Sequence, residues 1–492
     1  MTDKPDPYIC EIRDLNERGQ GVGIVMEDGS ASPPRRGMVC FVDGALPGEK
    51  VAASLIEAKG RYLVLNLERI VEASPGRIES DCDYFPLCGS CRLRHLSYAA
   101  ELNFKEKRVR GQLIHKGLLE SGSPVFKPIV GMDHPFHYRG KSIFPIALSA
   151  NGESGLQIGQ YSYGSHNLVD LRHCEIQSEA ALILVNRVRE LALRDKVVAY
   201  KEETQEGTLR HLLVRTAFSA RQVMLVFVVN DKEADRPILS WLPDLRVSLK
   251  PSGFTLQSVW INYMDVRGNR ILSSDYRHLD GSETIEEVIN QVTYRISPDS
   301  FFQVNPGQAA VLFDEVIRAA RLHPGDRVLD LYSGVGALSL QLASAMKDTT
   351  PPLEVTGVDR VTQAVMDART NADINDLRNL TFIEADATRW LKDYEDNPQN
   401  LPFDAIVVDP PRKGLDPQAI EAIRGSGTPR IIYVSCNPAT LSRDLALLGD
   451  VYEIESVQPI DMFPRTTHVE TIVHLSHKMP VATIKVNLDI EK

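Results

Sequence analysis

Five short apolar segments in the C-terminal part of the chain alternate with stretches that have a helical pattern. The segments read RVLDLY, EVTGVD, LTFIEAD, FDAIVVDPP and RIIYVSC, and several of them end in or beside an aspartate. Such alternation is typical of a doubly wound, mostly parallel α/β sheet, which binds its ligands at the carboxyl ends of the strands. The pattern predicts a domain of this class over residues 286–492.

The rest of the chain predicts two further domains, since 492 residues are too many for one ordinary domain. Residues 8–72 contain about five strand patterns separated by turn residues, which fit a barrel of the OB type or another small β domain. A cysteine-rich loop (76–95), a basic amphipathic helix (97–120) that could pack on the last domain, and a mixed α/β stretch follow. We therefore expect three domains, at 1–72, 73–285 and 286–492.

Composition indicates a soluble, cytoplasmic protein. The chain is 43% hydrophobic and 25% charged, and its sequence has neither a membrane-length apolar run nor a signal peptide. A net charge of −11 argues against a protein that coats polyanions in general. It is compatible with nucleic acid bound at a local basic patch.

A Gly-rich turn follows the first of the five strand patterns, in DRVLDLYSGVGALSL (326–340). Gly334 and Gly336 allow the backbone to approach a ligand closely at a helix N-terminus. A dinucleotide-binding fold would also show this G-x-G. The third glycine of its fingerprint is missing here, because Ser339 stands in that position.

Acidic residues end the following strand patterns. Asp359 lies about two dozen residues after the Gly-rich turn, where it can accept from ribose hydroxyls, and Asp386 could bond an adenine amino group. Asp409 begins a D-P-P motif that recurs in methyltransferases acting on planar base atoms. Each acid alone could merely cap a helix. As a set they fit S-adenosylmethionine (SAM) in a class I methyltransferase better than NAD.

Cys436 stands directly after the strand pattern RIIYVS, at the edge where the ligand site is expected. A lone cysteine is more often a small buried hydrophobe, but its place beside the expected SAM pocket favours catalysis. C5 of uracil is a poor nucleophile, and a thiolate that adds to C6 makes C5 able to attack the methyl group of SAM. This reaction requires a thiol with a pKa below the ordinary value of about 8.5, and a base for the C5 proton.

The candidate base lies in PIDMFPRTTHVETIVHL (459–475). Glu470 begins a strand-like run after a turn at Pro464. His468 is the alternative, because its ordinary pKa suits proton abstraction near neutral pH. The spacing of the segment leaves both residues open.

Three motifs in this order, DPPRKGL (409–415), SCNPATLSRDL (435–445) and DMFPRTTHVE (461–470), closely resemble those of the RNA uracil-C5 methyltransferases, which form 5-methyluridine. The resemblance covers nearly the whole chain, and its C-terminal motifs are specific to the reaction. It implies that Cys436 is the nucleophile and that Glu470 is the base.

The resemblance also implies the residues of the SAM site. SFFQVN (300–305) matches a family motif whose glutamine, here Gln303, contacts SAM and the substrate region. Ala337 stands where some relatives have a polar side chain, so one contact is expected to be lost. Asp409 is also expected to orient the flipped base. The residues expected to bind the cofactor are Gln303, Tyr332, Gly334, Gly336, Ala337, Asp359, Asp386 and Asp409.

Four of the seven cysteines predict a metal centre, because disulfides are not expected in a cytoplasmic protein. Cys82, Cys88 and Cys91 are spaced C-x5-C-x2-C, and Cys174 is the one cysteine left in the central region. From the residues alone the centre could be zinc or an iron–sulfur cluster. The resemblance favours the [4Fe–4S] cluster of the larger family members, with Ser90 replacing a glycine of their motif. We expect a structural or RNA-shaping cluster, since methyl transfer moves no electrons.

Other segments point to RNA as the partner. GALPGE (44–49) resembles the TRAM domain, an OB-like RNA-binding module of these enzymes. FHYRGKSIF (136–144) resembles the family's Y-R-N-K, with Gly140 in place of Asn. Apart from some that only form a solvated helix face, the basic residues expected to meet RNA are Arg92, Arg94, Lys105, Lys107, Arg108 and Arg110.

Together these features indicate a SAM-dependent enzyme that methylates uridine C5 in 23S rRNA. It would consist of a TRAM barrel, an iron–sulfur central domain and a Rossmann-like class I methyltransferase domain, and it is expected to be a monomer without a membrane partner. Methylation of the tRNA T-loop is the first alternative. A non-catalytic iron–sulfur RNA-binding protein would be expected to lack Cys436 or Glu470, and a cytosine-C5 methyltransferase would carry its cysteine after Pro or Thr.

Overall fold

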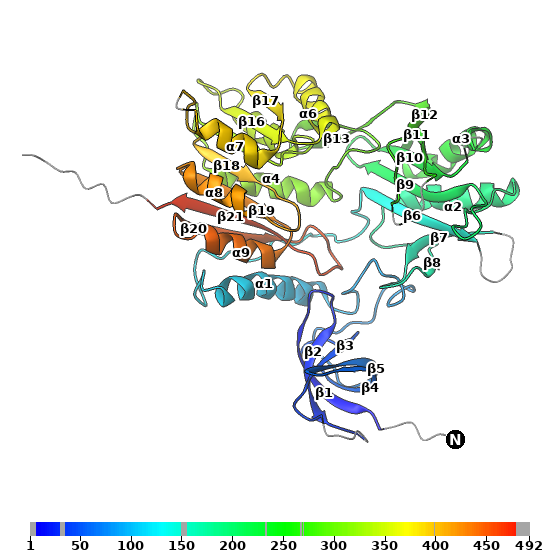
Figure 1. The fold of residues 1–492 in the computed structure, drawn as a ribbon. Helices are drawn as coiled ribbons and strands as arrows, with labels where there is room; N and C mark the ends of the chain where they lie inside the picture. Colours follow the sequence, from blue (N-terminus) through cyan, green and yellow to red (C-terminus); the bar gives the residue numbers. More distant parts are fainter. Residues whose placement is uncertain are drawn as a thin grey trace, which may run out of the picture. The chain divides into compact units, whose positions relative to one another are not determined.

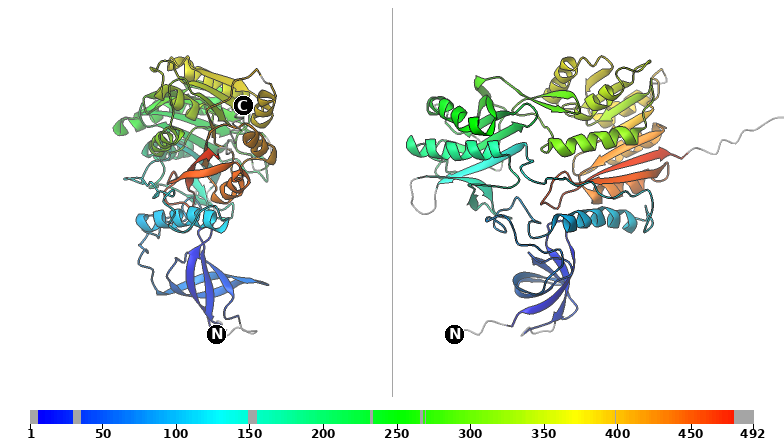
Figure 2. Two further views of the ribbon diagram at one scale, coloured as in Figure 1. Left: turned by 90° about the vertical axis from the view of Figure 1, so that its left-hand side faces the viewer. Right: turned by 180° about the vertical axis from the view of Figure 1, so that it is seen from behind.

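The computed structural model describes residues 6–29, 35–148, 155–231, 234–265, 268, 270–397 and 399–478. Two compact units interleave along the chain. Unit 1 consists of Met1–Lys107, Ile129–Val311 and Ile460–Val469, and unit 2 of Arg108–Pro128, Leu312–Pro459 and Glu470–Lys492. Figure 1 shows the elements coloured along the sequence, and Figure 2 shows them from two further sides. Among the helices of the described ranges, none is long and apolar enough to cross a membrane.

Unit 1 begins with a closed barrel of strand order β1-β2-β3-β5-β4, drawn in blue in Figure 1. Its strands are β1 (Tyr8–Leu15), β2 (Gly21–Glu27), β3 (Val39–Asp43), β4 (Lys50–Lys59) and β5 (Tyr62–Glu72). Successive side chains of a strand point to opposite faces, and the inward row, which includes Cys10, Cys40 and Leu63, is fully buried. The five strand patterns expected from the sequence therefore form a barrel.

The central part of unit 1 contains a seven-stranded sheet of order β12-β11-β10-β9-β6-β7-β8. The strands are β6 (Lys141–Leu148), β7 (Leu156–Tyr161), β8 (Leu168–Asp170), β9 (Leu209–Ala217), β10 (Gln222–Val229), β11 (Thr255–Tyr263) and β12 (Tyr276–Gly281). Apolar residues of this sheet share one core with the helices α2 (Glu179–Arg194) and α3 (Asp235–Leu249), and a short 3-10 helix η1 (Lys250–Ser252) follows α3.

A separate hairpin, β13 (Ile285–Ile289) and β14 (Val292–Ile296), follows the central sheet. Its two turn residues, Asn290 and Gln291, have positive φ angles of 47° and 68°. Two consecutive residues with positive φ match the twist of a tight hairpin. Two longer helices, α1 (Tyr98–His115) and α4 (Pro306–Ala320), each contain residues of both units.

Unit 2 is built on a second seven-stranded sheet, of order β17-β16-β15-β18-β19-β21-β20. Its strands are β15 (Arg327–Leu331), β16 (Glu354–Asp359), β17 (Leu380–Glu384), β18 (Ala405–Val408), β19 (Arg430–Ser435), β20 (Tyr452–Ile460) and β21 (Glu470–His477). The helices between them are α5 (Ala337–Ala345), α6 (Thr362–Ile374), α7 (Ala387–Glu395), α8 (Pro417–Gly425) and α9 (Pro438–Leu448). Strands β15 to β19 pair in parallel, whereas β21 pairs with β19 antiparallel. The doubly wound sheet predicted from the sequence is present, with β21 added antiparallel to β19 and β20 beyond it.

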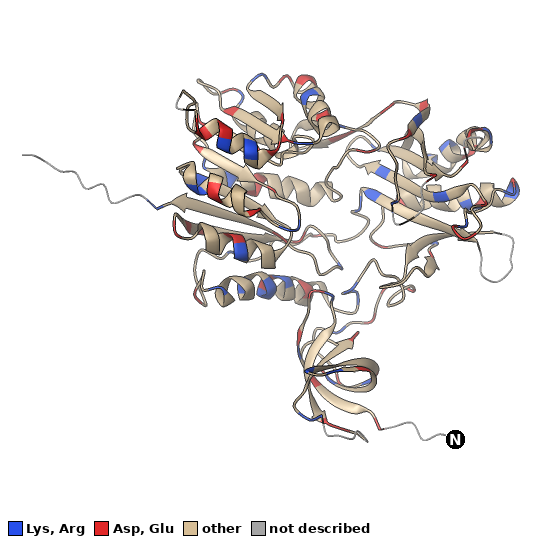
Figure 3. Ribbon diagram, in the orientation of Figure 1, with Lys and Arg blue, Asp and Glu red and all other residues tan. Residues whose placement is uncertain are grey.

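Acidic and basic residues are interspersed along the elements of both units (Figure 3). This mixture agrees with the moderate net charge of −11. Any binding of a polyanion must then depend on local groups rather than on the net charge of the chain.

Candidate active site

The strand order of the unit 2 sheet reverses between β15 and β18. From β15 the chain adds β16 and β17 on one side, and later β18 and β19 on the other. Ligands of doubly wound sheets bind at such a switch point, outside the carboxyl ends of the strands. Tyr332 directly follows β15 and Asp409 directly follows β18, so both predicted residues lie at this edge.

The turn after β15 leaves room for a ligand at its backbone. Tyr332, Gly334 and Gly336 have positive φ angles of 66°, 54° and 77°. A Cβ added at Gly336 would lie 2.5 Å from the Phe382 ring, so this position has to be glycine. A Cβ added at Gly334 would meet nothing within 4 Å, so the backbone there faces open space. The turn therefore fits the predicted cofactor.

Asp359, the last residue of β16, is fixed against this turn. Its two carboxylate oxygens accept from the backbone N–H groups of Gly334 at 2.9 Å and Val361 at 2.8 Å. A carboxylate has more lone pairs than these two bonds use. Asp359 can therefore still accept from two ribose hydroxyls without moving.

The remaining residues predicted for the cofactor lie at the starts of two helices. Asp386 is the N-cap of α7, and its Oδ1 accepts from the Arg389 N–H at 3.1 Å. The helix-cap interpretation thus holds for this acid, and a contact with adenine stays a prediction. The Tyr332 hydroxyl lies 3.5 Å from Thr388 Oγ1, and burial raises the pKa of Tyr332. Ala337 is the first residue of α5 and carries only a methyl group.

Cys436 and Glu470 are brought together by the register of β19 and β21. Ser435 pairs with Thr471 in this antiparallel ladder. The next residues outward are Cys436 and Glu470, so the predicted nucleophile and the predicted base lie on neighbouring strand ends. Asp409 follows β18, which is the neighbour of β19 on its other side. Three motifs that are distant in the sequence thus meet at one edge.

Burial raises the pKa values of all three groups, and negative charge adds to this effect at Cys436 and Glu470. The pKa of Cys436 is raised to about 11, first by burial and then by the charge of Glu470. The pKa of Glu470 is raised to about 8 by burial and by the charge of Asp409. Burial raises the pKa of Asp409 to about 7. The expectation of a thiol with a lowered pKa is wrong for the free protein, because burial and the two carboxylates disfavour a thiolate.

Arg412 is a residue of this site that sequence reasoning missed. Its positive charge lowers the pKa values of both Cys436 and Glu470 and so opposes the effect of burial. Its backbone carbonyl accepts from Asn437 Nδ2 and Thr440 Oγ1, both at 3.2 Å. The signal in the sequence was its place directly after D-P-P.

A buried carboxylate holds the DPPRKGL segment against α9. Asp444 Oδ2 accepts from the Leu415 N–H at 2.8 Å and from the Tyr433 hydroxyl at 2.7 Å. Gly414 has a φ of 75°, and a Cβ there would collide with the same carboxylate. The loop that follows Asp409 is thereby fixed to the helix that follows Cys436.

Among the residues predicted for catalysis and SAM binding, Gln303 and the alternative base His468 belong to unit 1, whereas the others belong to unit 2. Gln303 lines a very small cavity together with Lys141, Arg215 and Phe302, among others. His468 lies in the last segment of unit 1, where its ring is 6.0 Å from that of Phe463. The contact of Gln303 with SAM and the choice between His468 and Glu470 as base stay predictions.

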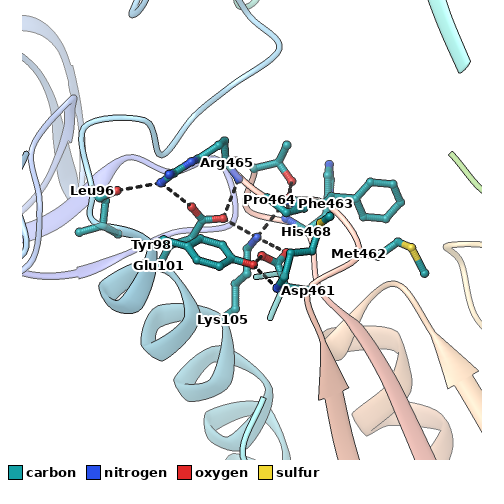
Figure 4. Close-up of polar contacts among 12 residues, drawn as sticks. Leu96, Tyr98, Glu101, Lys105, Asp461, Met462, Phe463, Pro464, Arg465 and His468 are labelled. Carbon is teal, nitrogen blue, oxygen red and sulfur yellow. Dashed lines mark hydrogen bonds and ion pairs between the residues drawn. The ribbon is translucent and has the colours of Figure 1, made fainter. Parts of the chain in front are cut away.

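The segment Asp461–Val469, which leads into Glu470, is held in unit 1 by a buried ion cluster (Figure 4). Lys105 on α1 is completely buried, and its Nζ lies 2.7 Å from Glu101 and 2.6 Å from Asp461. It also donates to the Phe463 carbonyl at 3.1 Å. One buried cation thus joins two carboxylates that are far apart in the sequence.

Further bonds hold the same segment at both ends. Glu101 accepts from the Arg465 N–H at 2.7 Å, and Asp461 accepts from the Tyr98 hydroxyl at 2.9 Å (Figure 4). Thr467 Oγ1 donates to the carbonyl of Glu17, in the turn after β1, at 2.7 Å. The chain that precedes Glu470 therefore has a defined path.

The four cysteines predicted to hold a metal centre line one small cavity of unit 1. Cys82, Cys88, Cys91 and Cys174 share it with Arg94, among others. Burial, followed by the charge of Cys174, raises the pKa of Cys91 to about 12, so its free thiol is protonated. As the side chains stand, no set of three or more His, Cys, Asp or Glu in the described ranges has the arrangement of metal ligands.

The donor chemistry of this cavity nevertheless fits an iron–sulfur cluster. Four thiols around one buried space are the ligand set that such clusters use. The buried guanidinium of Arg94, whose Nε donates to Asp81 at 2.8 Å, supplies positive charge beside the thiols. The four cysteines line one cavity, and the presence of a cluster there stays a prediction.

Two of the six basic residues of 92–110 that were candidates for contact with RNA are instead buried in ion pairs. Arg94 is 1% exposed and paired with Asp81, and Lys105 is fully buried in the ion cluster. Arg92 pairs with Asp43, and the Arg110 guanidinium lies 4.1 Å from the centre of the Phe126 ring. Spacing along a helix does not distinguish a solvated cation from one paired inside the protein.

Comparison with known proteins identifies the family. Residues 204–478 match the family model described as tRNA (uracil-5-)-methyltransferase. An uncharacterized RNA methyltransferase of Halalkalibacterium halodurans is 36% identical over 479 residues, which are 96% of this chain and 98% of that protein. One from Listeria innocua is 36% identical over 468 residues, which are 95% and 97% of the two chains. The chain therefore belongs to the RNA uracil-C5 methyltransferase family and is a SAM-dependent RNA methyltransferase.

A solved structure agrees with this assignment. The tRNA (uracil-54, C5)-methyltransferase of Pyrococcus abyssi, in complex with S-adenosyl-L-homocysteine, superposes with a TM-score of 0.72 at 26% identity. The match covers 96% of this chain and all of that one, at 100%. The similarity extends over both units rather than over the methyltransferase sheet alone.

Proposed function

We propose that this protein methylates C5 of a uridine in 23S rRNA, with SAM as methyl donor and Cys436 as a covalent nucleophile. The observation that carries the proposal is the convergence of Asp409, Cys436 and Glu470 at the ligand-binding edge of the unit 2 sheet. Membership of the uracil-C5 family supports the class of reaction. A cytosine enzyme is disfavoured by the Ser-Cys-Asn-Pro context of the cysteine.

The residues of this edge suggest a sequence of steps. The Cys436 thiol loses its proton and bonds to C6, which gives C5 the electron density to accept a methyl group. SAM, when bound, supplies that electrophilic methyl group. Glu470 then takes the C5 proton, and the C6–S bond breaks with its electron pair returning to sulfur. A pKa of about 8 makes Glu470 a stronger base near neutral pH than an ordinary carboxylate.

The cofactors are assigned to residues of the two units. We assign SAM to Tyr332, the open backbone at Gly334, Gly336 and the fixed carboxylate of Asp359, with Ala337, Asp386, Asp409 and Gln303 completing the site. We assign a [4Fe–4S] cluster to Cys82, Cys88, Cys91 and Cys174, in a structural or RNA-shaping role. The common cavity of these cysteines supports the second assignment.

The RNA-binding parts and the organisation follow from the same proposal. We interpret the β1–β5 barrel as a TRAM domain (1–72), residues 73–285 as the iron–sulfur domain and 286–492 as the methyltransferase domain. The target base has to leave its stack, because Cys436 approaches C6 within the protein. A loop or refolded strand of RNA therefore suits the site better than a regular duplex. We propose a cytoplasmic monomer.

Methylation of a tRNA T-loop uridine is the second candidate. The observation that favours it is the similarity over almost the full chain to the Pyrococcus abyssi enzyme, which acts on uracil 54 of tRNA. The chemistry of the two candidates is the same, so they differ only in the RNA that reaches the edge with Cys436. A non-catalytic iron–sulfur RNA-binding protein is disfavoured because Cys436 and Glu470 are both present.

The test is methyl transfer from labelled SAM to unmodified 23S rRNA and, separately, to unmodified tRNA, with nucleoside analysis of the products. We expect 5-methyluridine in rRNA and none in tRNA, and rRNA fragments would then locate the uridine. 5-Methyluridine in tRNA alone would show that the second candidate function is the correct one. If protein with an intact cluster forms 5-methyluridine in neither RNA, the proposed reaction is wrong.

A further inference from the structure

An open bowl of about 390 Å³ in unit 1 lies outside the proposed catalytic edge. It is lined by residues 160–166, at the end of β7 and in the turn after it, and by Gly89 and Ser90 of the cysteine-rich loop. This volume lies within the range of about 300–1,000 Å³ that is common for ligand sites. Tyr161 and Tyr163 in its wall remain 40% and 43% exposed.

The wall of the bowl is held by contacts between its two segments. The Gly89 N–H donates to the Tyr161 carbonyl at 3.0 Å. A Cβ added at Gly89 would lie 2.8 Å from that carbonyl oxygen, so only glycine allows this approach. The turn itself is closed by the Ser162 N–H, which donates to the Asn167 carbonyl at 2.8 Å. The bowl is therefore formed before any ligand arrives.

Two tyrosine rings lie in this wall, and Tyr163 also contacts Arg92, which is not one of the lining residues. The Arg92 guanidinium lies 3.9 Å from the centre of the Tyr163 ring. The Tyr161 ring meets His166 edge-on, with 5.7 Å between the ring centres. Exposed aromatic rings beside an arginine are the usual platform for stacking unpaired bases, because every base has a π face.

Polar groups of the bowl are already oriented. Gln160 Nε2 donates to the Ile143 carbonyl at 2.8 Å, which fixes the amide, and its Oε1 accepts from Ser90 Oγ at 3.4 Å. The hydroxyls of Ser162 and Ser165 bond each other at 2.5 Å. Hydroxyl and amide groups beside these aromatic rings can bond the polar edge of a base. An apolar peptide side chain would leave them without a partner from the ligand.

We propose that this bowl binds an unpaired nucleobase of the RNA substrate, stacked on Tyr161 and Tyr163. The inference rests on the proposed function, since it assigns RNA as the ligand, and it adds a second contact to the one made by the methylated base. It also assigns a role in RNA binding to the cysteine-rich loop, because Gly89 and Ser90, which lie between Cys88 and Cys91, form part of the wall. Stacking predicts little preference among bases.

The test is the affinity of the full-length protein for a short, unstructured, fluorescein-labelled oligouridylate, measured by anisotropy. We expect Tyr161→Ala and Tyr163→Ala each to weaken binding about tenfold or more, the loss typical of one stacked base. Tyr161→Phe and Tyr163→Phe keep the rings and should bind as the unaltered protein does. Val247→Ala is the matched control, since Val247 is an apolar residue of α3 that is 59% exposed.

Two further readouts separate this role from a merely structural one. Circular dichroism of each variant should be unchanged, and the alanine variants should raise the KM for RNA while kcat at saturating RNA stays the same. An oligonucleotide with 5-iodouridine should cross-link, on irradiation, to the peptide that contains residues 160–166. Alanine variants that bind RNA normally, or cross-links confined to other peptides, would overturn the inference.

The binding assay does not depend on methyl transfer, so the two proposals can fail separately. Loss of oligouridylate binding in the alanine variants would support the bowl as an RNA site even if neither 23S rRNA nor tRNA gains 5-methyluridine. Normal binding in these variants, with 5-methyluridine formed in rRNA, would overturn the proposed role of the bowl but support the proposed reaction.

Discussion

Cys436 lies in surroundings that oppose its ionisation. Burial and the charge of Glu470 raise its pKa to about 11, and the exposed Arg412 only partly compensates. A thiol kept protonated in the free protein is less exposed to oxidation and unwanted alkylation, because the thiolate is the reactive form. In the proposed mechanism, Cys436 has to ionise when bound substrate or cofactor changes the charges around it.

The rate of methyl transfer should therefore rise with pH. In the proposed mechanism Glu470 acts as a base in its ionised form, and its raised pKa of about 8 means that this form increases as pH rises from 6 to 8. Single-turnover rates at saturating RNA and SAM should increase about ninefold from pH 6 to 7 and about fivefold from pH 7 to 8. A flat profile over this interval would show that Glu470 is already ionised and contradict the electrostatics of the site.

A variant that removes a positive charge provides a second test of how the rate depends on pH. Arg412→Gln removes the positive charge that lowers the pKa values of Cys436 and Glu470, so its pH profile should shift to higher pH. Lys413→Gln changes the charge of the next, exposed residue and should leave the profile in place. Equal shifts in both variants would mean that general surface charge, not Arg412, is responsible.

Glu470→Gln should trap RNA on the protein. Without the carboxylate the C5 proton stays in place after methylation, and the C6–S bond cannot break. The loss of a negative charge beside Cys436 also lowers its pKa, so the bond should form more readily. Denaturing gels should show a slowly migrating adduct with this variant but not with Glu453→Gln, an exposed acid on β20. Normal product release would transfer the base role to His468 or water.

Among the elements, the turn between β15 and α5 tolerates substitution least, because it requires glycine at position 336. Gly336→Ala places a Cβ against the Phe382 ring at a φ of 77°, so it should cost more than about 1 kcal/mol of unfolding free energy. It should also weaken SAM binding, measured by calorimetry, because the turn that holds Gly334 shifts. Gly425→Ala is the control, since its Cβ would meet only Glu395 Oε2, at 3.8 Å. Normal SAM affinity in Gly336→Ala would contradict the assigned cofactor site.

The ion cluster of α1 should be essential for the path of the segment before Glu470. Lys105→Met leaves Glu101 and Asp461 buried without their shared cation, and removing one partner of a buried pair costs about 3–5 kcal/mol. Thermal unfolding should therefore begin several degrees lower, while Lys107→Met, exposed on the same helix, should unfold normally. If Lys105→Met is as stable as the unaltered protein, the cluster does not hold this segment.

Elements were predictable from the sequence where their pattern is local. The strands around the Gly-rich turn, D-P-P and Cys436 lie where apolar runs and turn residues placed them, and Glu470 does begin a strand. The assignment of Lys105 and Arg94 to RNA was wrong, because spacing does not show that both are buried in ion pairs. Glu101 is only four residues from Lys105, but the second partner of Lys105 is distant. Asp461, which pairs with Lys105, is 356 residues away in the chain.

The whole molecule shows the same limit of sequence reasoning. The chain forms two interleaved units, and Ile460–Val469 belongs to the first although its flanking segments belong to the second. The position of this segment is fixed by long-range ion pairs and backbone hydrogen bonds. These produce no periodic pattern in the sequence. The raised pKa of Cys436 could not be predicted from the sequence either, since it arises from burial and from the carboxylates of Glu470 and Asp409.

At this scale the central claim is that an RNA uridine becomes bonded to Cys436 during methyl transfer. The most direct measurement is the intact mass of the full-length protein after incubation with SAM and a substrate RNA that carries 5-fluorouridine, followed by peptide mapping. Because fluorine replaces the C5 proton, Glu470 has nothing to remove and the bond to C6 should persist. The account predicts a protein–RNA adduct that maps to Cys436 and is absent from Cys436→Ala. An adduct at another residue, or normal methylation of unmodified RNA by Cys436→Ala, would contradict it.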